Sequence, residues 1–207
     1  MMNALKCMLH RIAVCAVAAA SCAAHAVNEA PDVLVKRTVE DVLEVISQTR
    51  DPGALRQLAE QKVVSNFDFV EMTRLAVGAN WRKASPEQKT ALESGFRALL
   101  VNVYTNALGK ASKQGSKRTV EVRPLPPAGS RDEALVKTIV REAGGAPLAI
   151  DYRMASRDGG WKVYDVLVEG VSLVTNYRTT FDAEVSRGGV DGLIKALQQK
   201  NGAPVSS

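Results

Sequence analysis

The spacing of apolar residues changes twice along this chain, and each change marks a change of secondary structure. Before residue 110 apolar residues recur at helical spacing, whereas from Arg118 to Val168 they alternate with other residues, as in a sheet with a buried face. Helical spacing returns over Val174–Val185 and Val190–Leu197. A helical half followed by a sheet half and a helical tail predicts an α+β fold.

The first half contains signals for four helices. One holds Val35 to Ile46 and stops at Asp51-Pro52-Gly53, and shorter helices are expected over Leu55–Val64 and Phe67–Val77. Ser85-Pro86-Glu87-Gln88 has the pattern of a capping box and opens a long helix, which we expect to fray at Gly109. The apolar face of this long helix consists of Leu92, Phe96, Leu99, Leu100, Val103 and Ala107.

The second half contains signals for an antiparallel meander of four to five strands. Glycine-rich turns at Gly144-Gly145 and Asp158-Gly159-Gly160 separate successive strands. We expect helices from the N-terminal half and from the C-terminal tail to pack on this sheet. The expected strands are Arg118–Arg123, Ala134–Arg141, Leu148–Ala155 and Trp161–Val168.

The last expected strand is mostly apolar on both faces. Simple alternation places Tyr164, Val166 and Val168 on one face, and Trp161, Val163, Asp165 and Leu167 on the other. Two explanations stay open. Further helix or a partner chain covers the second face, or the strand lines a cavity for an apolar ligand.

Residues 1–26 have the features of an export signal. Lys6 and Arg11 precede the short apolar segment Ile12–Ala20, and Ala24-His25-Ala26 fits a cleavage site. The apolar segment falls well short of the roughly 20 residues of a membrane-spanning helix. We therefore expect a periplasmic protein with one domain over residues 27–200 and a flexible tail over 201–207. A lipid anchor on Cys22 is the alternative.

Cleavage at this site removes every cysteine and histidine, because Cys7, Cys15, Cys22, His10 and His25 all precede residue 27. A mature chain without them excludes disulfides, thiol nucleophiles, Ser-His-Asp triads and metal sites built from Cys or His. The removed segment contains two basic residues and no acidic ones, so cleavage lowers the formal charge from +5 to +3. A net charge of this size is only weak evidence for nucleic-acid binding. We expect no cofactor and no metal.

Asp165 and Glu169 fall on one face of the last strand, and two carboxylates so placed are candidates for a catalytic pair. Four residues along a strand span about 13 Å, which exceeds the separation used by glycosidases. We interpret Asp165 as a structural hydrogen-bond acceptor and Glu169-Gly170 as the bend that ends the strand.

Several sequence motifs resemble those of one protein family and occur in the same order as in that family. Residues 161–181, WKVYDVLVEGVSLVTNYRTTF, closely resemble the signature of the MlaC family of periplasmic phospholipid carriers, also called the toluene-tolerance substrate-binding family. Residues 67–69 (FDF), 75–82, 85–88 (SPEQ), 96–104 (FRxLLxxxY) and 191–194 (DGLI) resemble other elements of that family. The departures are Val77, where a second Leu is usual, and the stretch from Lys110 to Glu133.

The resemblance implies a carrier that moves one phospholipid between an outer-membrane lipoprotein complex and an inner-membrane ABC transporter bearing an MCE-domain ring. Two acyl chains expose on the order of 30 methylenes at about 0.8 kcal/mol each, so the carrier must supply an apolar cavity. It needs no catalytic group, so we expect no enzyme. We expect a monomer with no nucleic-acid partner.

Candidate lipid contacts are apolar or aromatic side chains from the long helix, the sheet and the start of the C-terminal helix. Ordinary core packing is the alternative for each. Arg82 and Arg178 are candidate phosphate neighbours or surface ion-pairing groups. The candidate lipid contacts are Trp81, Phe96, Leu99, Leu100, Val103, Tyr104, Tyr152, Val163, Tyr164, Val166, Val168, Val171, Leu173, Val174 and Tyr177.

Three other functions stay open at this point. A carrier of another lipid, such as a hopanoid, would use the same kind of cavity. A scaffold or adaptor without a ligand would have a filled core and a sizeable exposed apolar patch. An enzyme for a small apolar substrate would need an acid-base pair inside its pocket.

Overall fold

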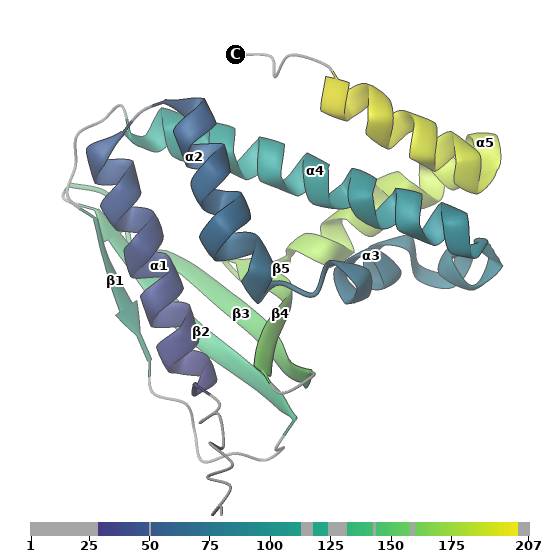
Figure 1. The fold of residues 1–207 in the computed structure, drawn as a ribbon. Coiled ribbons are helices and arrows are strands. Elements are labelled where there is room, and N and C mark those ends of the chain that lie inside the picture. Colours follow the sequence, from purple (N-terminus) through teal and green to yellow (C-terminus); the bar gives the residue numbers. More distant parts are fainter. Residues whose placement is uncertain are drawn as a thin grey trace, which may run out of the picture.

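A computed structural model describes residues 29–49, 51–112, 118–123, 132–142, 144–157 and 160–202. A sheet with one helix across it forms one layer, and a group of helices forms the other (Figure 1). The predicted export signal and most of the predicted tail lie outside the described residues. No helix in the described ranges has the length and apolar character needed to span a membrane.

The N-terminal helices are α1 (Pro31–Gln48) and α2 (Pro52–Leu58). The predicted breaker Asp51-Pro52-Gly53 also starts α2, because the Asp51 carboxylate accepts a hydrogen bond from the Ala54 amide at 2.8 Å. The second helix therefore begins three residues before the predicted Leu55. It continues as a π-helical turn, η1 (Ala59–Val63), and a 3₁₀ turn, η2 (Val64–Asn66).

The next two helices begin at side-chain caps. In α3 (Phe69–Val77) the Asp68 carboxylate accepts from the Glu71 amide, and the helix ends at Gly78 as predicted. A 3₁₀ segment, η3 (Gly78–Lys83), leads to α4 (Pro86–Ser112). The capping box is confirmed, since the Ser85 amide donates to the Gln88 side chain at 2.9 Å and the Gln88 amide donates to Ser85 Oγ at 3.2 Å.

The long helix α4 differs from the prediction at its C-terminal end. It continues past Gly109 to Ser112, because a single glycine inside a helix costs only about 1 kcal/mol. Leu92, Phe96, Leu99 and Leu100 are buried as predicted, but Val103 and Ala107 are exposed. Burial in this part of α4 falls instead on Val101 and Thr105.

The sheet is the predicted antiparallel meander, with strand order β1-β2-β3-β4-β5. The turn at Gly144-Gly145 is present, with Gly144 at a φ of +78°. Of the Asp158-Gly159-Gly160 turn, only Gly160 lies within the described residues. The strands are β1 (Arg118–Val122), β2 (Glu133–Glu142), β3 (Leu148–Arg157), β4 (Gly160–Val168) and the short β5 (Val171–Ser172).

The C-terminal helix α5 (Leu173–Gly202) is two helices joined by a kink. Gly188 and Gly189 leave helical geometry, with φ of −139° and +66°, so the two predicted helical segments are confirmed. The predicted tail boundary at residue 201 is wrong. Asn201 is still helical, and its side-chain amide donates to the carbonyl of Gly95 at 3.0 Å, which holds the second segment on α4.

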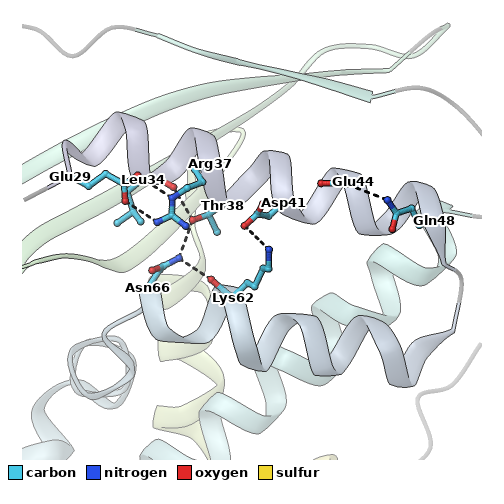
Figure 2. Close-up of polar contacts among 9 residues, drawn as sticks. All are labelled: Glu29, Leu34, Arg37, Thr38, Asp41, Glu44, Gln48, Lys62 and Asn66. Carbon is cyan, nitrogen blue, oxygen red and sulfur yellow. Dashed lines mark hydrogen bonds and ion pairs between the residues drawn. The ribbon is translucent and has the colours of Figure 1, made fainter.

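Polar contacts hold α1 beside the segment that returns from α2 (Figure 2). Lys62 lies 3.3 Å from the Asp41 carboxylate, and the Asn66 side-chain amide donates to Thr38 Oγ1 at 3.0 Å. On its other side η1 is joined to α4 by an ion pair between Glu60 and Arg97. These contacts place η1 between the helix that covers the sheet and the helical layer.

The helical layer has its own core around Phe96. This ring is fully buried and makes edge-to-face contacts with Tyr177 and Phe181 at centroid distances of 5.1 Å each. Met72 from α3 and Leu193 and Leu197 from the second part of α5 complete the cluster. A large ring therefore links α3, α4 and both parts of α5.

Replacing Phe96 with Ala should lower the free energy of unfolding by about 3–5 kcal/mol, because it leaves a cavity and removes the contacts of the buried ring with Tyr177 and Phe181. Denaturant unfolding followed by circular dichroism measures this change. Val70→Ala is the control on the exposed side of α3, since Val70 is 51% exposed, and its effect should be within about 0.5 kcal/mol. Equal midpoints for the two variants would contradict the assignment of this core.

Candidate functional site

Two apolar clusters meet where the helical layer joins the sheet. The sheet cluster contains Val136, Met154 and Val163 together with Leu34 and Val35 of α1. Phe67 is partly buried against both this cluster and the helical one. We call the region between the two clusters the apolar junction. By this name we mean Phe67 together with the partly buried Tyr152, Trp161 and Val166 on the sheet side, Leu173 and Tyr177 of α5, and Tyr104 of α4, which lies near Tyr177.

Phe67 is fixed at the junction by the backbone. It forms a parallel bridge with Val163, and the Asp68 amide donates to the Val163 carbonyl at 2.8 Å. The sequence pattern missed this role, because Phe67 reads as the first residue of a helix that in fact begins at Phe69. The Asp68 cap is the signal that would have placed Phe67 outside the helix.

The candidates on α4 fall into two groups. Phe96, Leu99 and Leu100 are buried and pack in the helical core. Val103 and Tyr104 are 38% and 40% exposed, although both are apolar side chains of the same helix. The second group leaves apolar surface open next to the junction.

Four of the sheet candidates, Tyr152, Val163, Val166 and Val168, share one face, and the predicted faces of β4 are wrong in part. Met154 pairs with Val163 and Arg153 pairs with Asp165, so Tyr164 is an extra residue in a β-bulge. The bulge moves Trp161 and Val163 to the face that carries Val166. Three of these residues pack with Tyr152 on the sheet cluster beneath α1: Trp161, Val163 and Val166.

The next candidates lie where the chain runs from the end of β4 into the first turn of α5. Val168 and Val171 pair across a two-residue turn in which Glu169 and Gly170 have φ of 49° and 78°. Val171 is 63% exposed, whereas Val174 is buried and Leu173 is partly buried against the helical core. The predicted bend at Glu169-Gly170 is confirmed.

Burial raises the pKa values of four tyrosines among the candidate residues. Burial is the main cause that raises the pKa of Tyr104 and of Tyr152 to about 12, and a contribution from Tyr177 adds to the shift at Tyr104. Burial also raises the pKa of Tyr177 and, with a smaller contribution from Glu133, that of Tyr164. Of these four phenols, Tyr104 and Tyr177 lie near each other, whereas Tyr164 has the charged groups of Glu133, Arg153 and Asp165 near it.

Asp165 has the structural role that we predicted. Its side chain is almost fully buried and accepts hydrogen bonds from Ser172 Oγ at 2.7 Å and from the Val174 amide at 3.2 Å. Arg153 lies 3.4 Å from the same carboxylate. Glu169 is engaged elsewhere and accepts from the Ala149 amide at 2.6 Å. The two carboxylates therefore stabilise the start of α5 and the beginning of β3.

Trp81 lies apart from the sheet candidates. It packs on the helical cluster and lines a surface pocket of about 490 Å³ between α3, η3 and α5. The two candidate phosphate neighbours, Arg82 and Arg178, line the same pocket. Within the described residues no group of three or more Asp, Glu, His or Cys side chains could hold a metal ion.

The fold has a close relative among solved structures. The phospholipid-binding protein from Ralstonia solanacearum, whose structure contains a phospholipid, matches with a TM-score of 0.74 and 35% identity. The match covers 82% of this chain and 96% of the Ralstonia chain. The fold is therefore of the same α+β class as the Ralstonia protein, with helices on an open antiparallel sheet.

Sequence comparisons identify the family of this chain. A family model described as MlaC protein matches residues 36–199. The intermembrane phospholipid transport system binding protein MlaC of Haemophilus influenzae is 22% identical over 183 residues, or 84% of each chain. The toluene tolerance protein ttg2D of Pseudomonas putida is 32% identical over 110 residues, which are 53% of this chain and 49% of ttg2D. This chain belongs to the MlaC family.

The raised tyrosine pKa values predict a titration. In the unfolded chain the phenols should ionise near pH 10, whereas Tyr104 and Tyr152 in the folded protein should hold their protons until about pH 12. Their contribution to stability is present below pH 10 and is lost as pH rises from about 10 to about 12. Tyrosinate absorbance of native and denatured protein measures both curves. Superimposable curves would contradict the apolar environment.

Proposed function

We propose that this chain is a periplasmic carrier that binds one phospholipid at the apolar junction. In this proposal it moves the lipid between an outer-membrane lipoprotein complex and an inner-membrane MCE-domain ABC transporter, and so maintains lipid asymmetry in the outer membrane. The observation that carries the proposal is the match to the Ralstonia phospholipid-binding protein, whose structure contains a phospholipid and is 35% identical over most of both chains.

The exposed apolar surface of three candidate residues supports the junction as the acyl-chain site. Val103, Tyr104 and Val171 keep large exposed fractions although they are apolar, and the tyrosine pKa values are raised by burial. A ligand with two acyl chains would cover such surface and remove it from water. Each Å² of apolar surface removed from water would stabilise the complex by about 25 cal/mol. Phe96, Leu99, Leu100 and Val174 would then form the packed wall behind the ligand.

The proposed chemistry needs no bond making. Transfer of a lipid requires an apolar site that competes with a bilayer, and the two carboxylates at the end of β4 already accept hydrogen bonds within the protein. Asp165 caps α5 and Glu169 closes the turn after β4. The proposal therefore assigns this chain no catalytic residue and no cofactor.

Native mass spectrometry of protein purified without detergent tests the proposal directly. We expect one phospholipid per chain, with solvent extraction followed by lipid mass spectrometry to identify it. A stoichiometric hopanoid would identify a different lipid cargo. A mass without any ligand, together with failure to take up added phospholipid, would point to a scaffold.

Val103→Asp should lower phospholipid occupancy by at least about tenfold, because a carboxylate facing acyl chains is desolvated without a partner. The variant should fold, since Val103 is 38% exposed. Val70→Asp is the matched control on α3, where Val70 is 51% exposed, and it should keep full occupancy. Equal occupancy in the two variants would place the lipid away from α4.

A further inference from the structure

The pocket between α3, η3 and α5 lies outside the proposed lipid site. Of the fifteen candidate lipid contacts only Trp81 lines it. Trp81 and Leu75 give it apolar surface, and Arg74, Arg82 and Arg178 give it guanidinium groups. Its volume of about 490 Å³ is within the range of sites that bind a few side chains or a small molecule. We call it the α3–α5 pocket.

The pocket is hollow because its lining is small at the end of α3. Gly78 has a φ of +62°, which disfavours other residues, and a Cβ there would lie 3.4 Å from Arg178 Nε. Ala79 is the next lining residue. Arg178 is held in place because its Nε and Nη2 donate to the Leu75 carbonyl at 3.1 and 2.7 Å. The walls are thus built by backbone geometry and by a fixed guanidinium.

The positive charge of the pocket is partly satisfied within the protein. Arg74 Nε donates to the Glu71 carboxylate at 2.7 Å, and Arg178 is bound to a carbonyl. Asp182, also in the lining, accepts from Asn80 at 3.3 Å. Arg82 is exposed, and among the described residues it has no hydrogen bond or ion pair. It is the free cationic donor of this pocket.

This composition fits a protein partner better than a phosphate group or a membrane. A phosphate dianion or an anionic bilayer would face one free guanidinium and the carboxylate of Asp182, which repels it. A carboxylate side chain needs one guanidinium, and an adjoining apolar side chain would find Trp81 and Leu75. Trp and Arg are also the residues most enriched at the energetic centres of protein interfaces.

We infer that the α3–α5 pocket is a docking site for a partner protein. The partner places an acidic side chain against Arg82 and an adjoining apolar side chain against Trp81 and Leu75. The inference rests on the proposed function, because a carrier must be recognised by the machinery with which it exchanges lipid. Docking here leaves the junction residues of the sheet and of α4 untouched.

Photo-cross-linking in cells tests the docking site. Benzoylphenylalanine replaces Val70, which is 51% exposed and precedes Arg74 by one helical turn. The control position is Val33 on α1, which is 50% exposed. We expect Val70 to cross-link a different protein, at a peptide that mass spectrometry shows to contain Asp or Glu beside an apolar residue. Val33 should give no such product.

Charge reversal decides whether the cross-link depends on the pocket. Arg82→Glu should lower its yield by at least about tenfold, since like charges at an interface repel strongly. Lys83→Glu makes the same charge change one residue away, outside the pocket lining, and should keep the yield. Reversing the partner's acidic residue to Lys should restore the product with Arg82→Glu. Circular dichroism checks that both variants fold.

Four outcomes would overturn the docking site. They are no product from Val70, a product with lipid alone, a product with a second copy of this chain, and a product that survives Arg82→Glu. Phospholipid content is measured on the same preparations. A chain that carries lipid but fails these tests refutes only the docking site, whereas a chain without lipid that passes them refutes the carrier function and keeps the docking site.

Discussion

The attachment of the helical layer to β4 is the constraint on which the rest of the structure depends. The Val163 carbonyl accepts the Asp68 amide, and the Asp165 carboxylate accepts the Val174 amide and the Ser172 hydroxyl. The β-bulge at Tyr164 lies between these two anchors. Because the bulge reverses the alternation, Val163 turns towards α1 while Asp165 turns towards α5. One strand therefore contacts both α1 and the start of α5.

This attachment leaves two apolar cores with a junction between them. The helical core closes around Phe96, and the sheet core closes beneath α1 around Met154. Tyr104 of α4 keeps 40% of its surface exposed. In the proposed function, acyl chains would cover surface of this kind, which a single continuous core would not offer. Two cores joined along one edge allow the fold to be stable and still to offer apolar surface to a ligand.

The helical layer also separates two kinds of surface. Tyr177 and Arg178 are neighbours in α5, yet Tyr177 packs on Phe96 while Arg178 reaches Leu75 at the end of α3. Helical geometry places consecutive side chains about 100° apart, so one helix serves both the apolar core and the α3–α5 pocket. A partner bound to this pocket and a lipid at the junction would contact different faces of the same helix.

The sequence by itself determined the α+β class, the strand order, the capping box at Ser85 and the kink region of α5, because periodicity, caps and glycines act over a few neighbouring residues. It also carried the motifs of the MlaC family. Only the tertiary structure decided that Trp161 and Val163 share a face with Val166, since one inserted residue reverses alternation without changing composition. The tertiary structure also decided which residues of α4 are exposed, and brought Arg82 and Arg178 into one pocket from positions far apart in the chain.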